Sequence, residues 1–186
     1  LLHRHNNLLH RHIHKMSQQS NNQSVVVAYY PEWGIYGHNY HVKDVPASKL
    51  THLIYAFVNL DQNGDIQLHD PWAAVEIPIT DQSHLGNFGQ ITLLKEKYPH
   101  LHVSVAVGGW TLSKHFSTVL STPEGRSHAS DSVITFLNKY TMFDGVDFDW
   151  EFPGGGGLGG NSEDKNDGHN YALFLEIMRS KLVELG

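Results

Sequence analysis

The chain has 186 residues, 40% of them hydrophobic, and a formal net charge of −6. This length suits the core of one ordinary domain, and the negative charge, without a Lys/Arg run interleaved with aromatic residues, argues against a nucleic-acid partner. The chain contains no cysteine, which excludes disulfides, thiolate metal sites and Cys nucleophiles. No apolar run approaches the ~20 residues that span a bilayer. We therefore expect no nucleic acid, no membrane and no obligate protein partner.

The N-terminal tract is unusually rich in histidine. Residues 1–15 read L-L-H-R-H-N-N-L-L-H-R-H-I-H-K, and the whole chain has 15 histidines. Such a tract can bind metal, but this one lacks the flanking ligands of a specific site, so we expect neither a metal nor a cofactor. We interpret residues 1–23 as a polar His-rich tail, disordered or not native to the protein. No signal peptide is visible, so the localisation stays open; a start at Met16 predicts an intracellular product.

From residue 24 onward, short apolar runs alternate with helix-like segments, which is typical of repeated βα units around a parallel sheet. Their near-continuous Val, Ile, Leu and Phe content predicts strands that are buried on both faces. Strands are expected at residues 25–30, 51–60, 101–107 and 143–151. Helices are expected at about residues 88–98 and 170–185, and a further helix begins at residues 122–124, where Thr-Pro-Glu is a typical capped start.

The last expected strand carries an unusual row of acidic residues. Side chains alternate between the two faces of a strand, so Asp147, Asp149 and Glu151 share one face at ~6.6 Å intervals. Phe148 and Trp150 take the other face. Neighbouring buried carboxylates cannot all ionise cheaply, so a proton is shared and at least one pKa is raised. This is how a glutamic acid is kept protonated near neutral pH, ready to act as a general acid.

Two other interpretations of the acidic row are a solvated edge strand and a Ca²⁺ or Mg²⁺ site. The flanking aromatic residues argue against a solvated edge, and hard cations usually draw their ligands from flexible loops. Asp144 has the opposite parity to the three acidic residues, so we expect a structural role for it at the entry of the strand.

The spacing Asp144-x-x-Asp147-x-Asp149-x-Glu151 resembles the DxxDxDxE signature of family-18 glycoside hydrolases. Other segments are similar to the bacterial chitinase A branch of that family: Y-Y-P-E-W-G-I-Y-G at 29–37, L-T-H-L-I-Y-A-F at 50–57, H-D-P-W-A-A at 69–74, G-N-F-G-Q at 86–90 and V-G-G-W-T-L-S at 107–113. The resemblance implies a (β/α)₈ TIM barrel, an α/β fold that needs ~250 residues. Residues 24–186 are therefore expected to form a partial catalytic barrel, with about the first four βα units present.

The resemblance also implies a chitinase that hydrolyses β-1,4 bonds between N-acetylglucosamine units of chitin or chitooligosaccharides. In this family catalysis is retaining and the substrate's own N-acetyl group is the nucleophile, an exception to the two-carboxylate rule. Glu151 would protonate the glycosidic oxygen and later activate water. Asp149 would hold the acetamido N–H and stabilise the oxazolinium, and Asp147 would share a proton with Asp149. The family is often secreted.

The same resemblance implies a set of substrate contacts. Trp33, Trp110 and Phe152 stand where the family stacks sugar rings, and flat aromatic rings suit the apolar faces of sugars. Trp33 and Trp110 also lie in Gly-flanked turns, where a core role is less natural. Tyr29 matches a tyrosine that supports the inner aspartate, and Phe57 lines the pocket floor or simply packs in the core.

One departure from the family pattern affects the catalytic strand. The third strand usually ends in Ser-x-Gly-Gly, whereas here it reads Ala106-Val107-Gly108-Gly109. Alanine cannot donate the hydrogen bond of that serine, so Asp147 is expected to be partly unsatisfied and proton cycling impaired. The alternatives to an active chitinase are a catalytically inactive, lectin-like chitin-binding barrel and an inactive fragment; the presence of Glu151 argues against the lectin.

Two further patterns are discounted. Gly155-x-Gly157-x-x-Gly160 matches a dinucleotide-binding fingerprint, but polar residues follow where the phosphate-binding helix should begin, so we expect a flexible loop. Asp61-x-Asn63-Gly64-Asp65 is similar to the start of a calcium loop but lacks its later Gly and Glu, so we expect a turn.

Overall fold

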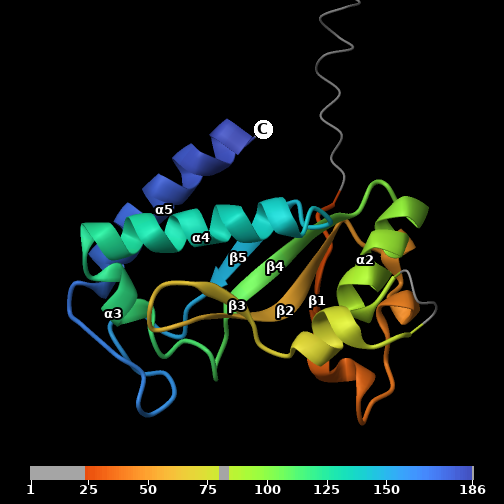
Figure 1. Ribbon diagram of the computed structural model, residues 1–186, viewed down its shortest axis with the longest axis horizontal. Coiled ribbons are helices and arrows are strands. Elements are labelled where there is room, and N and C mark those ends of the chain that lie inside the picture. Colours follow the sequence, from red (N-terminus) through yellow and green to blue (C-terminus); the bar gives the residue numbers. More distant parts are fainter. Residues whose placement is uncertain (1–23, 80–83, 186) are drawn as a thin grey trace, which may run out of the picture.

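The structure is a computed structural model that describes residues 24–79 and 84–185 (Figure 1). The His-rich tract and the expected boundary of the domain after residue 23 lie outside the described residues. Within the described part of the chain, no helix has the length and apolar character that crossing a membrane requires.

Four parallel strands form the sheet, in the order β1-β2-β4-β5. Their bounds are Val27–Pro31 for β1, His52–Leu60 for β2, His102–Gly108 for β4 and Gly145–Asp149 for β5. All four strands were expected from the apolar runs. Strand β5 is shorter than expected: it ends at Asp149, so Glu151 lies two residues beyond the strand.

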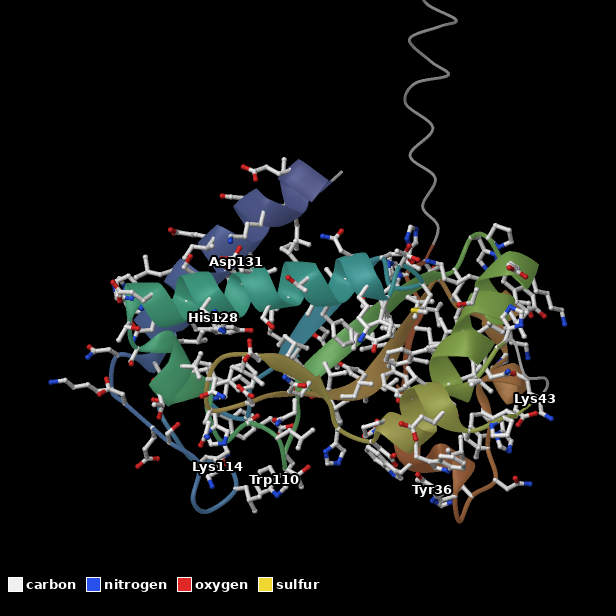
Figure 2. The ribbon with its side chains drawn as sticks, viewed as in Figure 1. Tyr36, Lys43, Trp110, Lys114, His128 and Asp131 are labelled. Atoms are coloured by element: carbon white, nitrogen blue, oxygen red, sulfur yellow. The ribbon has the colours of Figure 1, made fainter. Side chains whose placement is uncertain are left out.

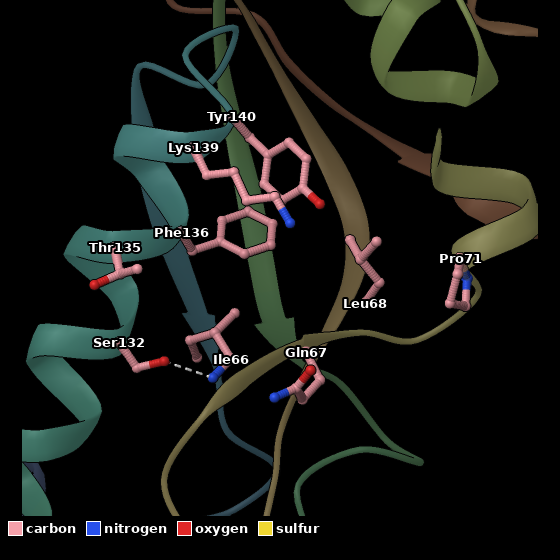
Figure 3. A pocket seen from close by; sticks show the side chains of 9 residues that line it. All are labelled: Ile66, Gln67, Leu68, Pro71, Ser132, Thr135, Phe136, Lys139 and Tyr140. Atoms are coloured by element: carbon pink, nitrogen blue, oxygen red, sulfur yellow. Dashed lines mark hydrogen bonds between the residues drawn. The ribbon is translucent and has the colours of Figure 1, made fainter. Parts of the chain in front are cut away.

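A fifth strand, β3 (Ile66–Leu68), pairs antiparallel with the end of β2 and was not expected from the sequence. The turn between the two strands is the Asp61 segment, in which Asp61 Oδ1 accepts the backbone N–H groups of Asn63 (2.8 Å) and Asp65 (2.9 Å). The interpretation of this segment as a turn is therefore confirmed. On its other side, β3 is joined to α4 (Pro123–Lys139), because the Ile66 N–H donates to Ser132 Oγ at 2.8 Å (Figure 3).

Helices follow the strands in the alternating order of βα units. The longer helices are α2 (Gly86–Lys97), α4 and α5 (Asp167–Leu185), and the short α3 (Phe116–Leu120) precedes α4. Three 3₁₀ turns lie between β1 and β2, at Glu32–Ile35, Val42–Asp44 and Ala47–Lys49, and a π-helical turn at Trp72–Glu76 precedes α2. As expected, α4 begins at a capped start: Thr122 Oγ1 accepts the Gly125 N–H at 3.0 Å, and proline occupies the first turn.

The two faces of the sheet have different environments. One face is buried under the helices, with Tyr30, Leu53, Tyr55 and Val105 each at most 1% exposed. Figure 1 shows α4 crossing in front of this face, with α2 beside it. Phe88 of α2 joins these layers, since its ring packs edge-on against Tyr55 and against rings of α4 and the β5 entry.

The opposite face of the sheet is partly open. Tyr29 on this face is 53% exposed, and Asp147 and Asp149 are both partly exposed. The expectation that the strands are buried on both faces is thus wrong for β1 and β5, because α2 and α4 cover only one face of the sheet within the described residues. The open face is the one that carries the acidic row.

The entry of β5 depends on Asp144. Its Oδ2 accepts a hydrogen bond from the buried backbone N–H of Val103 at 2.8 Å, and its Oδ1 accepts one from Lys95 Nζ at 2.6 Å. Lys95 also donates to the Met142 carbonyl at 2.8 Å. Asp144 therefore ties β4, β5 and α2 together, which is the structural role that its parity predicts.

We expect Asp144→Ala to lower the free energy of unfolding by about 1–3 kcal/mol, because it leaves the Val103 N–H without its acceptor. Asp144→Asn is the matched control: the amide oxygen can still accept that N–H, and the loss of the partly exposed ion pair with Lys95 costs at most ~1 kcal/mol. Urea unfolding of both variants measures the difference. Equal losses in the two variants would contradict this role.

A buried polar network lies under the turn that follows β1. Glu32 is 2% exposed, and its Oε2 accepts the Tyr55 hydroxyl at 3.1 Å, while Asn87 of α2 donates to the Glu32 carbonyl at 3.2 Å. Burial raises the pKa of Glu32 to about 8; the hydrogen bond from Tyr55 opposes this shift, and the negative charge of Asp70 adds to it. Glu32 is thus a carboxyl group that the fold keeps protonated at neutral pH.

This network predicts a pH-dependent stability. Below about pH 4.5 Glu32 is protonated in both folded and unfolded states; between 4.5 and about 8 only the folded state retains the proton, so stability falls as pH rises. Glu32→Gln cannot ionise. The melting temperature of Glu32→Gln minus that of the wild type should therefore increase from pH 4.5 to pH 8, and scanning calorimetry over that range measures it. A difference independent of pH would refute the raised pKa.

Candidate active site

The carboxyl ends of β4 and β5 are held together by an unusually close backbone approach. The Gly109 N–H donates to the Asp149 carbonyl at 2.7 Å. A Cβ on Gly108 would lie 2.5 Å from that same carbonyl oxygen, and both glycines have positive φ, 110° and 79°. A side chain on Gly108 would displace the end of β5, and one on Gly109 would meet the ring of Phe57, 2.7 Å from its Cβ.

Tyr29 and the acidic row meet on the open face of the sheet. The Tyr29 hydroxyl donates to Asp147 Oδ2 at 2.7 Å, which joins β1 to β5 across the intervening strands. Burial raises the pKa of Tyr29, and the hydrogen bond to Asp147 and the charges of Asp147 and Asp149 raise it further. The tyrosine therefore stays protonated and remains a donor to Asp147.

Asp149 and Glu151 both have raised pKa values. For Asp149 the main cause is burial and the second is the negative charge of Asp147; for Glu151 burial again comes first, followed by the charge of Asp149. The acidic residues therefore influence one another in sequence along the strand. Such coupling favours a protonated carboxyl group at the end of the row.

Ser113 positions the backbone at Glu151 and was missed by the sequence reasoning. It is fully buried; its Oγ donates to the carbonyl groups of Gly109 (2.8 Å) and Asp149 (3.3 Å) and accepts the Glu151 N–H at 2.9 Å. The available signal was its place at the end of the V-G-G-W-T-L-S segment. Residue type alone gave no signal, because a serine three residues after a tryptophan is not a distinctive pattern.

The opposite parity of Phe148 and Trp150 is confirmed by their packing. Phe148 contacts Phe174 of α5 edge-on, with ring centroids 4.9 Å apart, and the 5%-exposed Trp150 stacks on Phe116 at 5.3 Å. These aromatic residues hold β5 to the helical layer. They leave the acidic side chains on the face that is free of helices.

An aromatic hollow of about 330 Å³ lies at the ends of the first strands. It brings together three of the expected substrate contacts, Trp33, Phe57 and Trp110, with His69, Thr111 and Leu112. Trp33 and Trp110 are each 49% exposed, and the ring of Trp33 stacks against Phe57 at 6.3 Å. Figure 2 shows Trp110 at the lower edge of the molecule, the edge towards which the strands point in Figure 1.

Phe152 is 47% exposed and does not line this hollow. It follows Glu151 at the start of the glycine-rich loop, which runs to the first residue of α5. Asp167, fully buried, holds that loop by accepting the N–H groups of Gly154 (3.0 Å) and Asp164 (2.9 Å) and the Ser117 hydroxyl (2.7 Å). The glycines therefore belong to a loop that Asp167 anchors, instead of the flexible loop expected from the sequence. Helix α5 begins seven residues after Gly160, whereas in a dinucleotide-binding turn the helix follows at once.

Ala106 lies directly beside Asp147 in the β4–β5 register and is fully buried. Its methyl group offers Asp147 no hydrogen bond, as expected from the sequence. Tyr29 supplies the hydrogen bond that Asp147 does receive. The support of the inner aspartate thus comes from β1.

Within residues 24–79 and 84–185, no group of three or more His, Cys, Asp or Glu side chains is arranged to hold a metal ion. A second hollow, of about 340 Å³, lies between β3 and α4 and contains none of the expected site residues (Figure 3). The candidate site is therefore the open face of β5 with the adjoining aromatic hollow.

Comparisons with known proteins identify the family of this chain. The family model described as Glycosyl hydrolases family 18 matches residues 25–186. Chitinase A1 of Niallia circulans is 37% identical over 87% of this chain and 28% of its own length, and the chitinase of Autographa californica nuclear polyhedrosis virus is 36% identical over 87% and 35%. The chain thus spans about a third of the length of these relatives.

Solved structures show the same similarity. The catalytic domain of psychrophilic chitinase B from Arthrobacter TAD20 superposes with a TM-score of 0.81 at 30% identity, covering 87% of this chain and 48% of that one. A Group IV chitinase of Ostrinia furnacalis in complex with allosamidin gives 0.73 at 32% identity, covering 87% and 41%. The α/β sheet described above corresponds to part of a TIM-barrel catalytic domain, and the chain belongs to the family-18 glycosyl hydrolases.

Proposed function

We propose that the protein containing this chain is a chitinase that hydrolyses β-1,4 bonds between N-acetylglucosamine units by substrate-assisted, retaining catalysis. The observation that carries the proposal is the row of Asp147, Asp149 and Glu151 on one open face, with raised pKa values for Asp149 and Glu151. The relatives support the substrate, since they are named chitinases.

Glu151 is the proton donor of this mechanism. Its raised pKa keeps a larger fraction of the carboxyl protonated near neutral pH, as a general acid requires. Its backbone is held by Ser113, so the side chain projects from a fixed point at the end of β5. After the glycosidic bond breaks, the resulting carboxylate takes a proton from the attacking water.

Asp149 and Asp147 act on the acetamido group. Asp149 accepts the acetamido N–H, which turns the carbonyl oxygen towards the anomeric carbon, and its negative charge then stabilises the oxazolinium. The charge of Asp147 raises the pKa of Asp149, so one proton shared between the two is consistent with their coupling. Tyr29 completes the chain by donating to Asp147.

Trp33 and Trp110 bind sugar rings in the aromatic hollow, with Phe57 as its floor. Two half-exposed tryptophans lining one hollow suit the apolar faces of successive saccharide units. Phe152, outside the hollow and next to Glu151, would stack a sugar nearer the scissile bond. The occupant of this site is therefore a chitin chain or a chitooligosaccharide.

Glu151→Gln in the complete protein tests the acid assignment. We expect turnover of a fluorogenic chitobiose substrate to fall by about 10²–10⁴-fold, because the amide cannot donate the proton. Asp144→Asn is the matched control, because it makes the same carboxylate-to-amide change at the entry of β5, away from the acidic row, and should keep most of the activity. Retained turnover in Glu151→Gln would sink the assignment, and a wild-type protein that binds chitin without turnover would favour the lectin-like alternative.

Ala106→Ser tests the support of Asp147. A hydroxyl at this register position would add a hydrogen bond to Asp147, worth ~0.5–1.5 kcal/mol, and we expect kcat to rise by about two- to tenfold with a shifted pH profile. Ala106→Cys is the control, because the thiol adds similar bulk but only a weak donor. An unchanged rate and pH profile in Ala106→Ser would show that Tyr29 alone suffices.

A further inference from the structure

One polar ring interrupts the aromatic lining of the hollow. His69 lines it together with Trp33, Phe57 and Trp110, and its side chain is 49% exposed. The mechanism proposed above makes no use of this residue. Among the large side chains that line the hollow, only the imidazole can both donate and accept a hydrogen bond, because an indole has a donor but no acceptor and a phenyl ring has neither.

The backbone of His69 is held on both sides. The preceding residue, Leu68, is the last of β3 and pairs with Val58 of β2. The following residue, Asp70, accepts the Tyr36 hydroxyl at 2.5 Å and the Ala73 N–H at 3.0 Å. His69 therefore projects into the hollow from a braced segment rather than from a free loop.

Behind the imidazole lies the buried carboxyl group of Glu32. Its Oε2 is bonded to the Tyr55 hydroxyl, but its Oε1, also inaccessible to solvent, has no hydrogen-bond partner among the described residues. His69 Nε2 lies 3.9 Å from this Oε1, which is beyond a direct hydrogen bond but within range of an electrostatic contact. A buried polar oxygen without a partner favours the ring orientation that keeps a nitrogen facing it, and because Glu32 is protonated at neutral pH, its O–H would be the donor and the ring nitrogen the acceptor.

Saccharide recognition needs such a group. Stacking on tryptophan fixes the plane of a sugar ring but leaves the ring free to turn within that plane, whereas hydroxyl and acetamido groups accept and donate along specific directions. Ligand pockets usually combine apolar walls with a few polar groups that fix the orientation of the ligand. A neutral imidazole can donate from one nitrogen and accept at the other.

We propose that His69 hydrogen-bonds the saccharide in the aromatic hollow and that Glu32 is the positioning residue that holds its ring. This inference rests on the proposed function, because it takes the occupant to be an N-acetylglucosamine chain. His69 sets the rotation of a stacked sugar, and so contributes to binding rather than to the proton transfers at Glu151.

The test uses the complete protein in the Glu151→Gln background, where binding is measured without turnover. Chitohexaose is titrated calorimetrically into this parent and into versions that also carry His69→Ala or His69→Gln. Loss of one hydrogen bond predicts about three- to tenfold weaker binding for His69→Ala. We expect a smaller loss for His69→Gln, whose amide can donate and accept. In the enzyme with Glu151 intact, His69→Ala should raise KM and leave kcat nearly unchanged.

His128→Ala is the matched control, since His128 is also an exposed histidine beside a carboxylate, Asp65, but lies on α4 outside the hollow (Figure 2). It should bind like the parent. Unchanged melting temperatures exclude misfolding as the cause of weaker binding by His69→Ala.

The role of Glu32 is tested by Glu32→Leu and Glu32→Gln. Chitohexaose binding should weaken in Glu32→Leu and be close to that of the parent in Glu32→Gln. When His69 is already alanine, Glu32→Leu should weaken binding little further.

The outcomes separate the inference from the function on which it rests. A parent that binds chitohexaose, with His69→Ala binding equally well, overturns the role of His69 and leaves the proposed function intact. A parent that binds no chitohexaose overturns both. Additive losses for Glu32→Leu and His69→Ala would remove Glu32 from the proposal.

Discussion

The contact between the Gly108-Gly109 turn and the Asp149 carbonyl is the constraint on which the site depends. A 2.7 Å hydrogen bond from Gly109 and the missing Cβ of Gly108 let β4 end directly against β5. The same turn carries Trp110 into the aromatic hollow, and Ser113, four residues after Gly109, reaches back to fix the Glu151 backbone. One close approach thus connects the acidic row with the aromatic hollow.

The division between the two faces of the sheet explains why the acidic row is tolerated. Phe148 and Trp150 anchor β5 to the helical layer by aromatic packing, while Asp147 and Asp149 stay partly exposed on the other face. Partial burial raises the pKa of Asp149 without the full desolvation penalty of the core. The stability of the strand therefore comes from one face and its chemistry from the other.

Glu32 and Glu151 show two uses of a carboxyl group with a raised pKa. Glu32 is almost fully buried and bonded to Tyr55, so its proton belongs to the packing of the turn under Trp33. Glu151 is partly exposed at the end of the acidic row, where a proton can reach a ligand. In both cases burial is the main cause of the shift, and position decides whether the carboxyl group is enclosed by the fold or accessible from the open face.

The sequence by itself determined the four parallel strands, the capped start of α4 and the shared face of Asp147 and Asp149 within β5, because apolar runs, capping residues and strand parity are local properties of the chain. It also indicated the structural role of Asp144. Strand β3, the buried Ser113 and Glu32, and the place of His69 beside Trp33, Phe57 and Trp110 were decided only by the tertiary structure. These residues are far apart in the chain and become neighbours only when the parallel strands align their carboxyl ends at one edge of the sheet, and no local pattern records which side chains meet there.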